Sequence, residues 1–84
     1  MKYGLVIEDA ASVAIAAMPE VVGELFTMAC FDVSADPHGL RGVTDTQAGH
    51  LTTRTWAVGA MGFILYDVDE QAAVVTITRV ISML

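Results

Sequence analysis

Residues 61–80 read MGFILYDVDEQAAVVTITRV, and this stretch predicts two β-strands joined by an acidic turn. The segment 63–68 is apolar on both faces over most of its length, which is typical of a central strand. The segment 73–81 is rich in β-branched residues, and Asp67 to Gln71 supplies the polar turn between the two. These strands form the last part of a predicted sheet.

A third strand is expected just before this hairpin, in the segment HLTTRTWAV at residues 50–58, because Thr and Trp favour strands. Strand alternation places four of its side chains on one face: Thr52, Arg54, Trp56 and Val58. The preceding residues 34–49 are dense in Gly, Asp, Thr and Pro, so we expect a long loop there.

The N-terminal half predicts one strand and two helices. KYGLVIE, residues 2–8, reads as a strand, and a helix capped by Asp9 follows as far as Met18. Pro19 ends it, and apolar residues then recur at three- and four-residue steps through residues 20–33. The order β-α-α-β-β-β indicates one α+β domain over residues 1–84, with an N-terminal strand and a helical hairpin packed on an antiparallel sheet.

The composition is that of a globular protein, with 55% hydrophobic and 17% charged residues. The longest apolar runs, residues 10–18 and 57–66, are shorter than the roughly 20 residues that a membrane-spanning helix needs. Lys2 stands alone before Glu8, without the basic start and unbroken apolar middle of a signal peptide. We therefore expect a cytoplasmic protein that does not contact a membrane.

The net charge of −6 bears most directly on function. Lys2, Arg41, Arg54 and Arg79 are the whole supply of Lys and Arg, which argues against strong non-specific binding of nucleic acid. A basic partner is electrostatically easier to bind. One cysteine and two histidines are too few for a confident metal site, so we expect no metal and no cofactor.

In the order of its elements and in several short motifs, the chain resembles the RelE/ParE superfamily of type II toxin–antitoxin toxins. The matching features are Met18-Pro19 where the family often has Leu-Pro, Asp36-Pro37 before the loop, Arg54 on a strand, Tyr66 in ILYDVDE where the family has an IYEVDE-like run, and Arg79-Val80 where it has LRV. The similarity extends over nearly the whole chain.

The resemblance implies a partner antitoxin that holds the toxin inactive, and one of two activities. RelE-like members cleave messenger RNA in the ribosomal A site and so repress translation, whereas ParE-like members poison DNA gyrase. Some of these modules stabilise plasmids. The nuclease chemistry implied rests on cations rather than a metal: basic groups stabilise the charge that develops on the phosphate, and another group handles the 2′-hydroxyl proton.

Carried over residue by residue, the resemblance implies catalytic roles for Arg54, Arg79 and Tyr66, and RNA binding by Arg41, Arg54 and Trp56. Three positions depart from the nuclease pattern. Phe63 replaces an arginine, Trp56 or Ala57 replaces a second basic residue, and the family's basic GHRRD-like stretch does not follow ISML. We therefore expect a metal-independent endoribonuclease that is weak or inactive.

Each of these residues also has a structural interpretation. Arg54 is either a phosphate contact or a solvated strand residue paired with an acid, and Trp56 either stacks on a base or packs under the helices. Tyr66 can be a core residue with its hydroxyl at the rim, and Arg79 can close a salt bridge across the sheet. The apolar end ITRVISML predicts a surface for an antitoxin or a second copy, or a segment folded back on the helices.

Two hypotheses follow. The first is a toxin-like component of a type II toxin–antitoxin module, with the antitoxin as its main partner and the ribosome with its messenger RNA, or DNA gyrase, as its target. The second is a non-catalytic interaction or regulatory domain that forms a homodimer.

Overall fold

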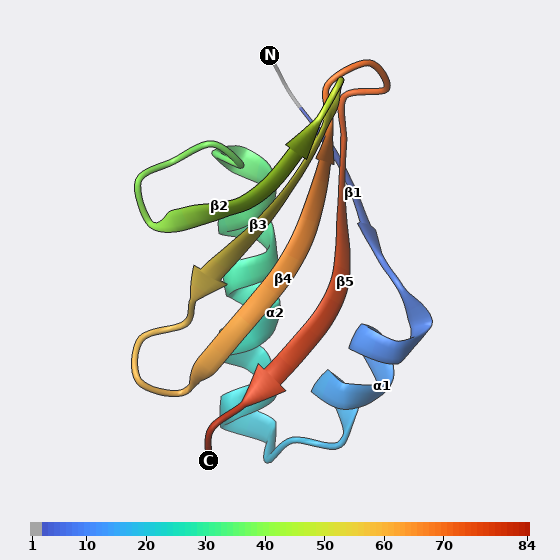
Figure 1. Cartoon of the computed structure of the whole chain (residues 1–84). Coiled ribbons are helices and arrows are strands. Elements are labelled where there is room, and N and C mark those ends of the chain that lie inside the picture. Colours follow the sequence, from blue (N-terminus) through green and yellow to red (C-terminus); the bar gives the residue numbers. More distant parts are fainter. Residues whose placement is uncertain (1–2) are drawn as a thin grey trace.

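The computed structural model describes residues 3–84, which form five strands and two helices (Figure 1). Lys2, where the first strand was expected to begin, lies outside the described residues. The elements in chain order are β1 (Gly4–Ile7), α1 (Asp9–Ala16), α2 (Glu20–Ala35), β2 (Gly42–Ala48), β3 (Leu51–Ala57), β4 (Gly62–Asp69) and β5 (Val74–Ser82).

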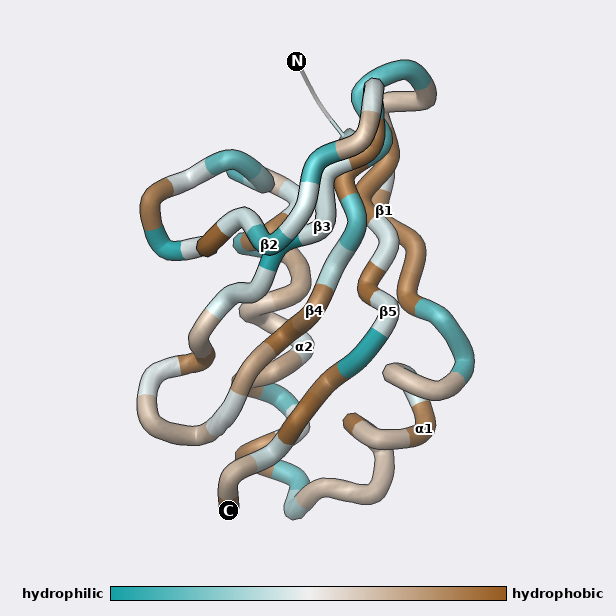
Figure 2. The backbone as a smooth tube through the Cα atoms, in the orientation of Figure 1, coloured by the Kyte–Doolittle hydropathy of each residue, from teal (hydrophilic) through white to brown (hydrophobic). Residues whose placement is uncertain are grey.

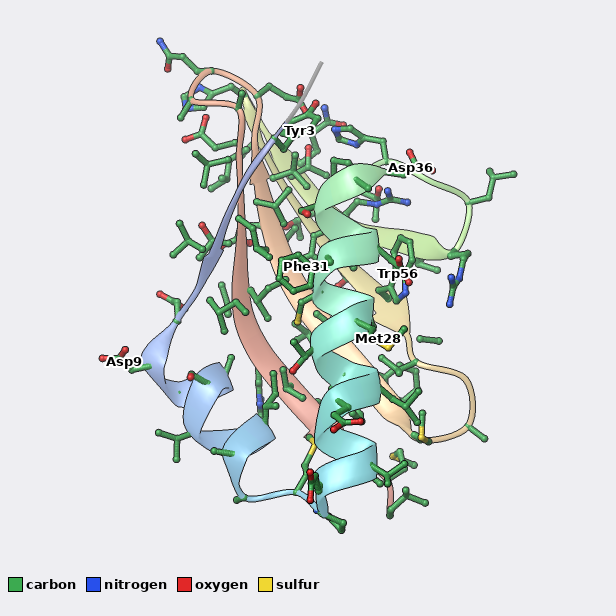
Figure 3. The ribbon with its side chains drawn as sticks, turned by 180° about the vertical axis from the view of Figure 1, so that it is seen from behind. Tyr3, Asp9, Met28, Phe31, Asp36 and Trp56 are labelled. Atoms are coloured by element: carbon green, nitrogen blue, oxygen red, sulfur yellow. The ribbon has the colours of Figure 1, made fainter. Side chains whose placement is uncertain are left out.

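The strands form one sheet in the order β1-β5-β4-β3-β2, with β4 at its centre. The three hairpins from β2 to β5 are antiparallel, whereas β1 pairs in parallel with β5. Both helices lie on one face of the sheet, and Figure 3 looks onto this helical layer from outside. The predicted α+β class, with a helical hairpin on a sheet, is confirmed, and the parallel pairing of β1 is the detail that the sequence did not predict.

The core lies between the helices and the sheet. Alternate residues of β3 and β4 point into it, and α2 contributes one face of its 16 residues. The largest fully buried side chains are those of Tyr66, Phe26, Ile64, Ile77, Val33, Val68, Val75 and Cys30. In Figure 2 the hydrophobic segments of β4 and β5 lie along the middle of the sheet, and hydrophilic residues mark the turn between these strands.

The predicted loop at residues 34–49 is wrong in two places. Helix α2 continues to Ala35, and β2 occupies Gly42–Ala48 as an edge strand paired with β3. Every β2 residue after Gly42 is exposed, so the strand carries no alternation of buried and exposed residues. Since that alternation is the main strand signal, and a bulge near Asp45 interrupts the pairing, the sequence gives little sign of this strand.

Helices α1 and α2 are connected at Pro19 and approach each other closely at Gly23. A Cβ atom at Gly23 would lie 3.1 Å from the carbonyl oxygen of Ile15, closer than most side chains tolerate. The buried residue of α1 is Ala11, whereas Val13 is 68% exposed. Among residues 3–84, neither helix has the length and apolar character that crossing a membrane requires.

The C-terminal segment does not form a free edge of the sheet. Strand β5 lies between β1 and β4, Val80 is buried, and the Met83 amide donates a hydrogen bond to the carbonyl oxygen of Met61. Leu84 remains 77% exposed. The strand is therefore paired on both edges.

Candidate functional site

The predicted site residues Arg54, Trp56 and Tyr66 lie on the face of the sheet that the helices cover. Strand alternation puts Arg54 and Trp56 on the same side of β3, and Tyr66 is the register partner of Arg54 on β4. Their exposed fractions are 6% for Arg54, 3% for Trp56 and 0% for Tyr66. The predicted common face of β3 is thus confirmed, and it is an interior face.

The two terminal nitrogens of the Arg54 guanidinium are hydrogen-bonded to the backbone of the segment between α2 and β2. They donate hydrogen bonds to three carbonyl oxygens, those of Pro37, Gly39 at 3.0 Å and Gly42 at 2.6 Å. We call residues 36–42 the Arg54-anchored loop. The planar fork of an arginine suits this task, because several donors in fixed directions can reach successive carbonyl groups.

Tyr66 holds the same loop from the neighbouring strand. Its hydroxyl donates a hydrogen bond to the Pro37 carbonyl oxygen at 3.0 Å. Burial raises the pKa of Tyr66 above its ordinary value of 10.0, more than the nearby Arg54 charge lowers it, and Asp36 raises the pKa further. The hydroxyl therefore keeps its proton at neutral pH and serves as a donor here rather than as a base.

The loop leaves no space for a larger residue at Gly42. A Cβ atom there would lie 2.5 Å from the Tyr66 hydroxyl and 3.2 Å from Cζ of Arg54. Gly42 is buried, unlike the rest of β2, because this strand begins directly against the two anchoring side chains. The glycine is thus part of the anchor.

Arg41 covers Trp56 from the outer side of the loop. The Cζ atom of Arg41 lies 4.8 Å from the centre of the Trp56 ring, a distance at which a cation and an aromatic face attract each other. Leu40, next to Arg41, is fully exposed. Of the two arginines at this loop, Arg41 is exposed to solvent and Arg54 is buried. Figure 3 shows Trp56 beside α2, below the segment that begins at Asp36.

Two buried donors of β3 have no hydrogen-bond partner within residues 3–84. They are Nε of Arg54 and Nε1 of Trp56. Leaving a buried donor unpaired costs free energy, on the order of 1–3 kcal/mol. These two N–H groups are the only ones so found among the side chains of the described region, and both belong to predicted site residues.

Arg79 lies on the opposite face of the sheet. Its register partner is Leu65, while the adjacent residue Tyr66 pairs with Arg54, and consecutive strand residues point to opposite faces. Arg79 is exposed. Phe63, which stands where the resembling family has an arginine, lies on this same face and is 38% exposed. The structure therefore brings Arg41, Arg54, Trp56 and Tyr66 together and separates Arg79 from them.

The sequence did not predict a second polar cluster at the outer side of the loop. His38 forms a hydrogen bond with the Glu70 carboxylate, and the Tyr3 hydroxyl donates to the same carboxylate at 2.7 Å. The His38 bond, and then the Tyr3 bond, hold the pKa of Glu70 below its ordinary value of 4.5. Tyr3, His38 and Glu70 lie far apart in the sequence, so no local pattern could have shown this cluster.

Within the described part of the chain, no three His, Cys, Asp or Glu side chains gather in a way that could hold a metal ion. Cys30 is buried on α2, and burial raises the pKa of its thiol to about 11.

Comparison with solved structures identifies the architecture. The RelE–RelB complex of the archaeon Pyrococcus horikoshii OT3 matches with a TM-score of 0.82 and 16% identity, over 98% of this chain and 96% of that chain. The chain has the RelE fold. The toxin–antitoxin complex RelBE2 of Mycobacterium tuberculosis matches with a TM-score of 0.81 and 21% identity, over 98% of this chain and 92% of that one. No protein-family model matches the sequence, and no curated protein is significantly similar to it.

The RelE fold also confirms the order of elements on which the resemblance rested. The predicted catalytic roles of Arg54, Arg79 and Tyr66, and the predicted RNA contacts of Arg41, Arg54 and Trp56, stay predictions.

Proposed function

We propose that this protein is the toxin-like component of a toxin–antitoxin module, that an antitoxin is its main partner, and that its ribonuclease activity is weak or absent. The observation that supports a partner is the fold itself. Two solved structures that share it over almost the whole chain are complexes of a RelE-type protein with an antitoxin. A binding role in the cytoplasm follows from this proposal.

The position of the cations supports the second part of the proposal. A phosphate in its transition state needs donors aimed at the developing charge, and removing one such donor costs roughly 2.7–4 kcal/mol in an enzyme site. Here Arg54 points inward, and its terminal nitrogens donate hydrogen bonds to the carbonyl oxygens of Pro37, Gly39 and Gly42. The exposed arginines of the described region lie apart, because Arg41 belongs to the Arg54-anchored loop and Arg79 to β5, on the face of the sheet away from the helices.

The test is complex formation with the product of the gene adjacent to this one in its genome. Both chains are co-expressed, and the complex is measured by size-exclusion chromatography with light scattering. We expect a stable complex that survives dilution to nanomolar concentration. Two separate peaks at every concentration, with both proteins folded by circular dichroism, would overturn the proposal.

Action on the ribosome or on DNA gyrase, and homodimer formation, stay predictions with their own measurements. Growth arrest on induction, relieved in Arg79→Ala, would indicate a live toxin. A supercoiling assay with purified gyrase separates the gyrase target from the ribosome, and light scattering of the chain alone reports the dimer.

A further inference from the structure

An open groove runs along the outside of the helical layer, between α1 and the first half of α2. Its volume is about 630 Å³, and it is lined by Ile15, Ala16, Met18, Glu20, Gly23, Glu24, Thr27 and Met28. The Arg54-anchored loop follows the other end of α2. The groove is therefore distinct from the cluster of predicted site residues.

The floor and walls of the groove are apolar and deformable. Met18 and Met28 supply unbranched thioether side chains that adapt to a partner's shape, and Ile15 adds an aliphatic contact. Met28 is 61% exposed, and Phe31, one turn further along α2, is 60% exposed. Figure 3 shows these two residues on α2 in the view from outside. Exposed apolar side chains of this size, gathered beside a groove, are typical of an interaction surface.

The rim of the groove carries negative charge. Glu20 and Glu24 are one helical turn apart on α2, both are exposed, and neither forms an ion pair with any residue of the described chain. Residues 9–35, which contain both helices, include Asp9, Glu20, Glu24 and Asp32 but no Lys, Arg or His. A partner that brings positive charge to this rim therefore meets no local cation that repels it.

The direction of the groove favours a helix as occupant. Glu20, Glu24 and Met28 follow one another at four-residue steps, so they form a ridge along α2 roughly 12 Å long at about 1.5 Å per residue. Such a ridge packs against the matching ridge of another helix. An apolar stripe flanked by basic residues is the surface that complements a methionine-lined groove with an acidic rim.

We propose that the groove between α1 and α2 binds an amphipathic helix of the partner, with apolar side chains on Met18 and Met28 and Lys or Arg residues opposite Glu20 and Glu24. This inference rests on the proposed function and adds the chemistry of the partner. A second copy of this chain fits the groove poorly, because every charged residue of its own helices is acidic and its net charge is −6. The partner segment is thus basic where this chain is acidic.

The test uses a fluorescent 18-residue peptide of leucine and lysine with leucines at i, i+3, i+4 and i+7, and the same peptide with glutamate in place of lysine. The full chain carries ¹³C-labelled methionine methyl groups. We expect the lysine peptide to bind and to shift the resonances of Met18 and Met28, while Met61 and Met83 stay unchanged. Equal binding of the glutamate peptide, or shifts of Met61 and Met83 as large as those of Met18 and Met28, would overturn the inference.

Matched variants separate this groove from general attraction by an acidic protein. Glu20→Gln with Glu24→Gln should weaken the lysine peptide about 5-fold at low ionic strength and less at high salt. Met28→Gln should weaken it about 10-fold, since it removes an exposed apolar side chain that lines the groove. Asp32→Asn removes a charge from the same helix outside the groove and should change binding less than about 2-fold. An equal loss in Asp32→Asn would contradict the proposal.

Binding of the adjacent gene's product to these variants tests the proposed function and the groove separately. If it binds the wild-type chain and weakens with the Glu20, Glu24 and Met28 changes, both stand. If it binds all variants equally, the groove inference fails and the proposed function survives. If it does not bind the wild-type chain at all, the proposed function fails and the inference fails with it.

Discussion

The two ends of α2 differ in how they use charge. At the C-terminal end, the loop after Asp36 is held by a buried cation, because Arg54 donates to the carbonyl oxygens of Pro37, Gly39 and Gly42. At the N-terminal end, Glu20 and Glu24 stand exposed beside an open apolar groove. The chain turns one of its few cations inward and leaves its acids outside.

This difference bears on function because it determines which charged side chains a partner can reach. A buried arginine that satisfies backbone carbonyls builds a rigid loop but cannot contact a phosphate unless that loop opens. Exposed carboxylates around a groove repel nucleic acid and attract a basic protein segment. The comparison therefore favours protein binding over RNA cleavage, and the following changes test each side of it.

The largest effect is expected from Arg54→Ala, which removes the hydrogen bonds that the side chain donates to the carbonyl oxygens of Pro37, Gly39 and Gly42. Removing one partner from a buried charged network costs about 3 kcal/mol of the free energy of unfolding. Urea denaturation followed by circular dichroism measures the loss. Arg79→Ala, on the exposed face, is the control and should change stability by less than about 0.5 kcal/mol. Equal effects of the two changes would refute the anchoring role of Arg54.

Gly42→Ala tests whether the anchor is tightly packed. The new Cβ atom would lie 2.5 Å from the Tyr66 hydroxyl, so Tyr66 or the loop must move, at a cost of about 2 kcal/mol. Gly4→Ala is the matched control, since the nearest atom to its Cβ would lie 3.8 Å away. Thermal unfolding midpoints compare the two, and a Gly42→Ala protein as stable as Gly4→Ala would show that the loop is loose.

A smaller loss is expected from Tyr66→Phe, which removes a single hydrogen bond to the Pro37 carbonyl oxygen. That oxygen also accepts from Arg54, so it keeps one partner, and the expected cost is about 1 kcal/mol. Denaturation in urea gives the value. In the Arg54→Ala background the same change should cost a different amount, because the two donors share one acceptor. Strict additivity of the two changes would contradict a shared anchor.

The smallest effect concerns the exposed hydrogen bond between His38, in the same loop, and Glu70. The pKa of Glu70 is lowered chiefly by its hydrogen bond with His38. Because the pKa of Glu70 is lower in the folded protein, its hydrogen bond with His38 stabilises the fold fully above the ordinary pKa of the carboxyl group. This stabilisation disappears as the pH falls through the lowered pKa. Carboxyl NMR titration should show the Glu70 pKa rising in His38→Ala. An unchanged pKa would show that this hydrogen bond does not form in solution.

The sequence predicted the elements that bury one clear face. The runs at residues 63–68 and 73–81, and the apolar steps of the second helix, led to β4, β5 and α2 with nearly correct bounds. Strand β2 was missed because its side chains are almost all exposed and its Asp and Gly residues are typical of loops. Local patterns report burial, so an exposed edge strand leaves little trace in them.

The site was predicted less well than the fold, for a different reason. Alternation along β3 correctly grouped Arg54 with Trp56, but it does not say whether that face meets solvent or the helices. The direction of the Arg54 side chain depends on carbonyl groups 12 to 17 residues away in the chain. One wall of the groove is visible in the sequence as the four-residue spacing of Glu20, Glu24 and Met28, which places these side chains on one face of a helix.

The most direct test of the central claim is messenger RNA cleavage in a purified translation system, read by primer extension after the folded chain is added at micromolar concentration. Our account predicts no new cut in the ribosomal A site, because the exposed arginines do not converge and Arg54 is held inside. A new ribosome-dependent cut that disappears in Arg79→Ala, while the variant stays as stable as the wild-type protein, would contradict it.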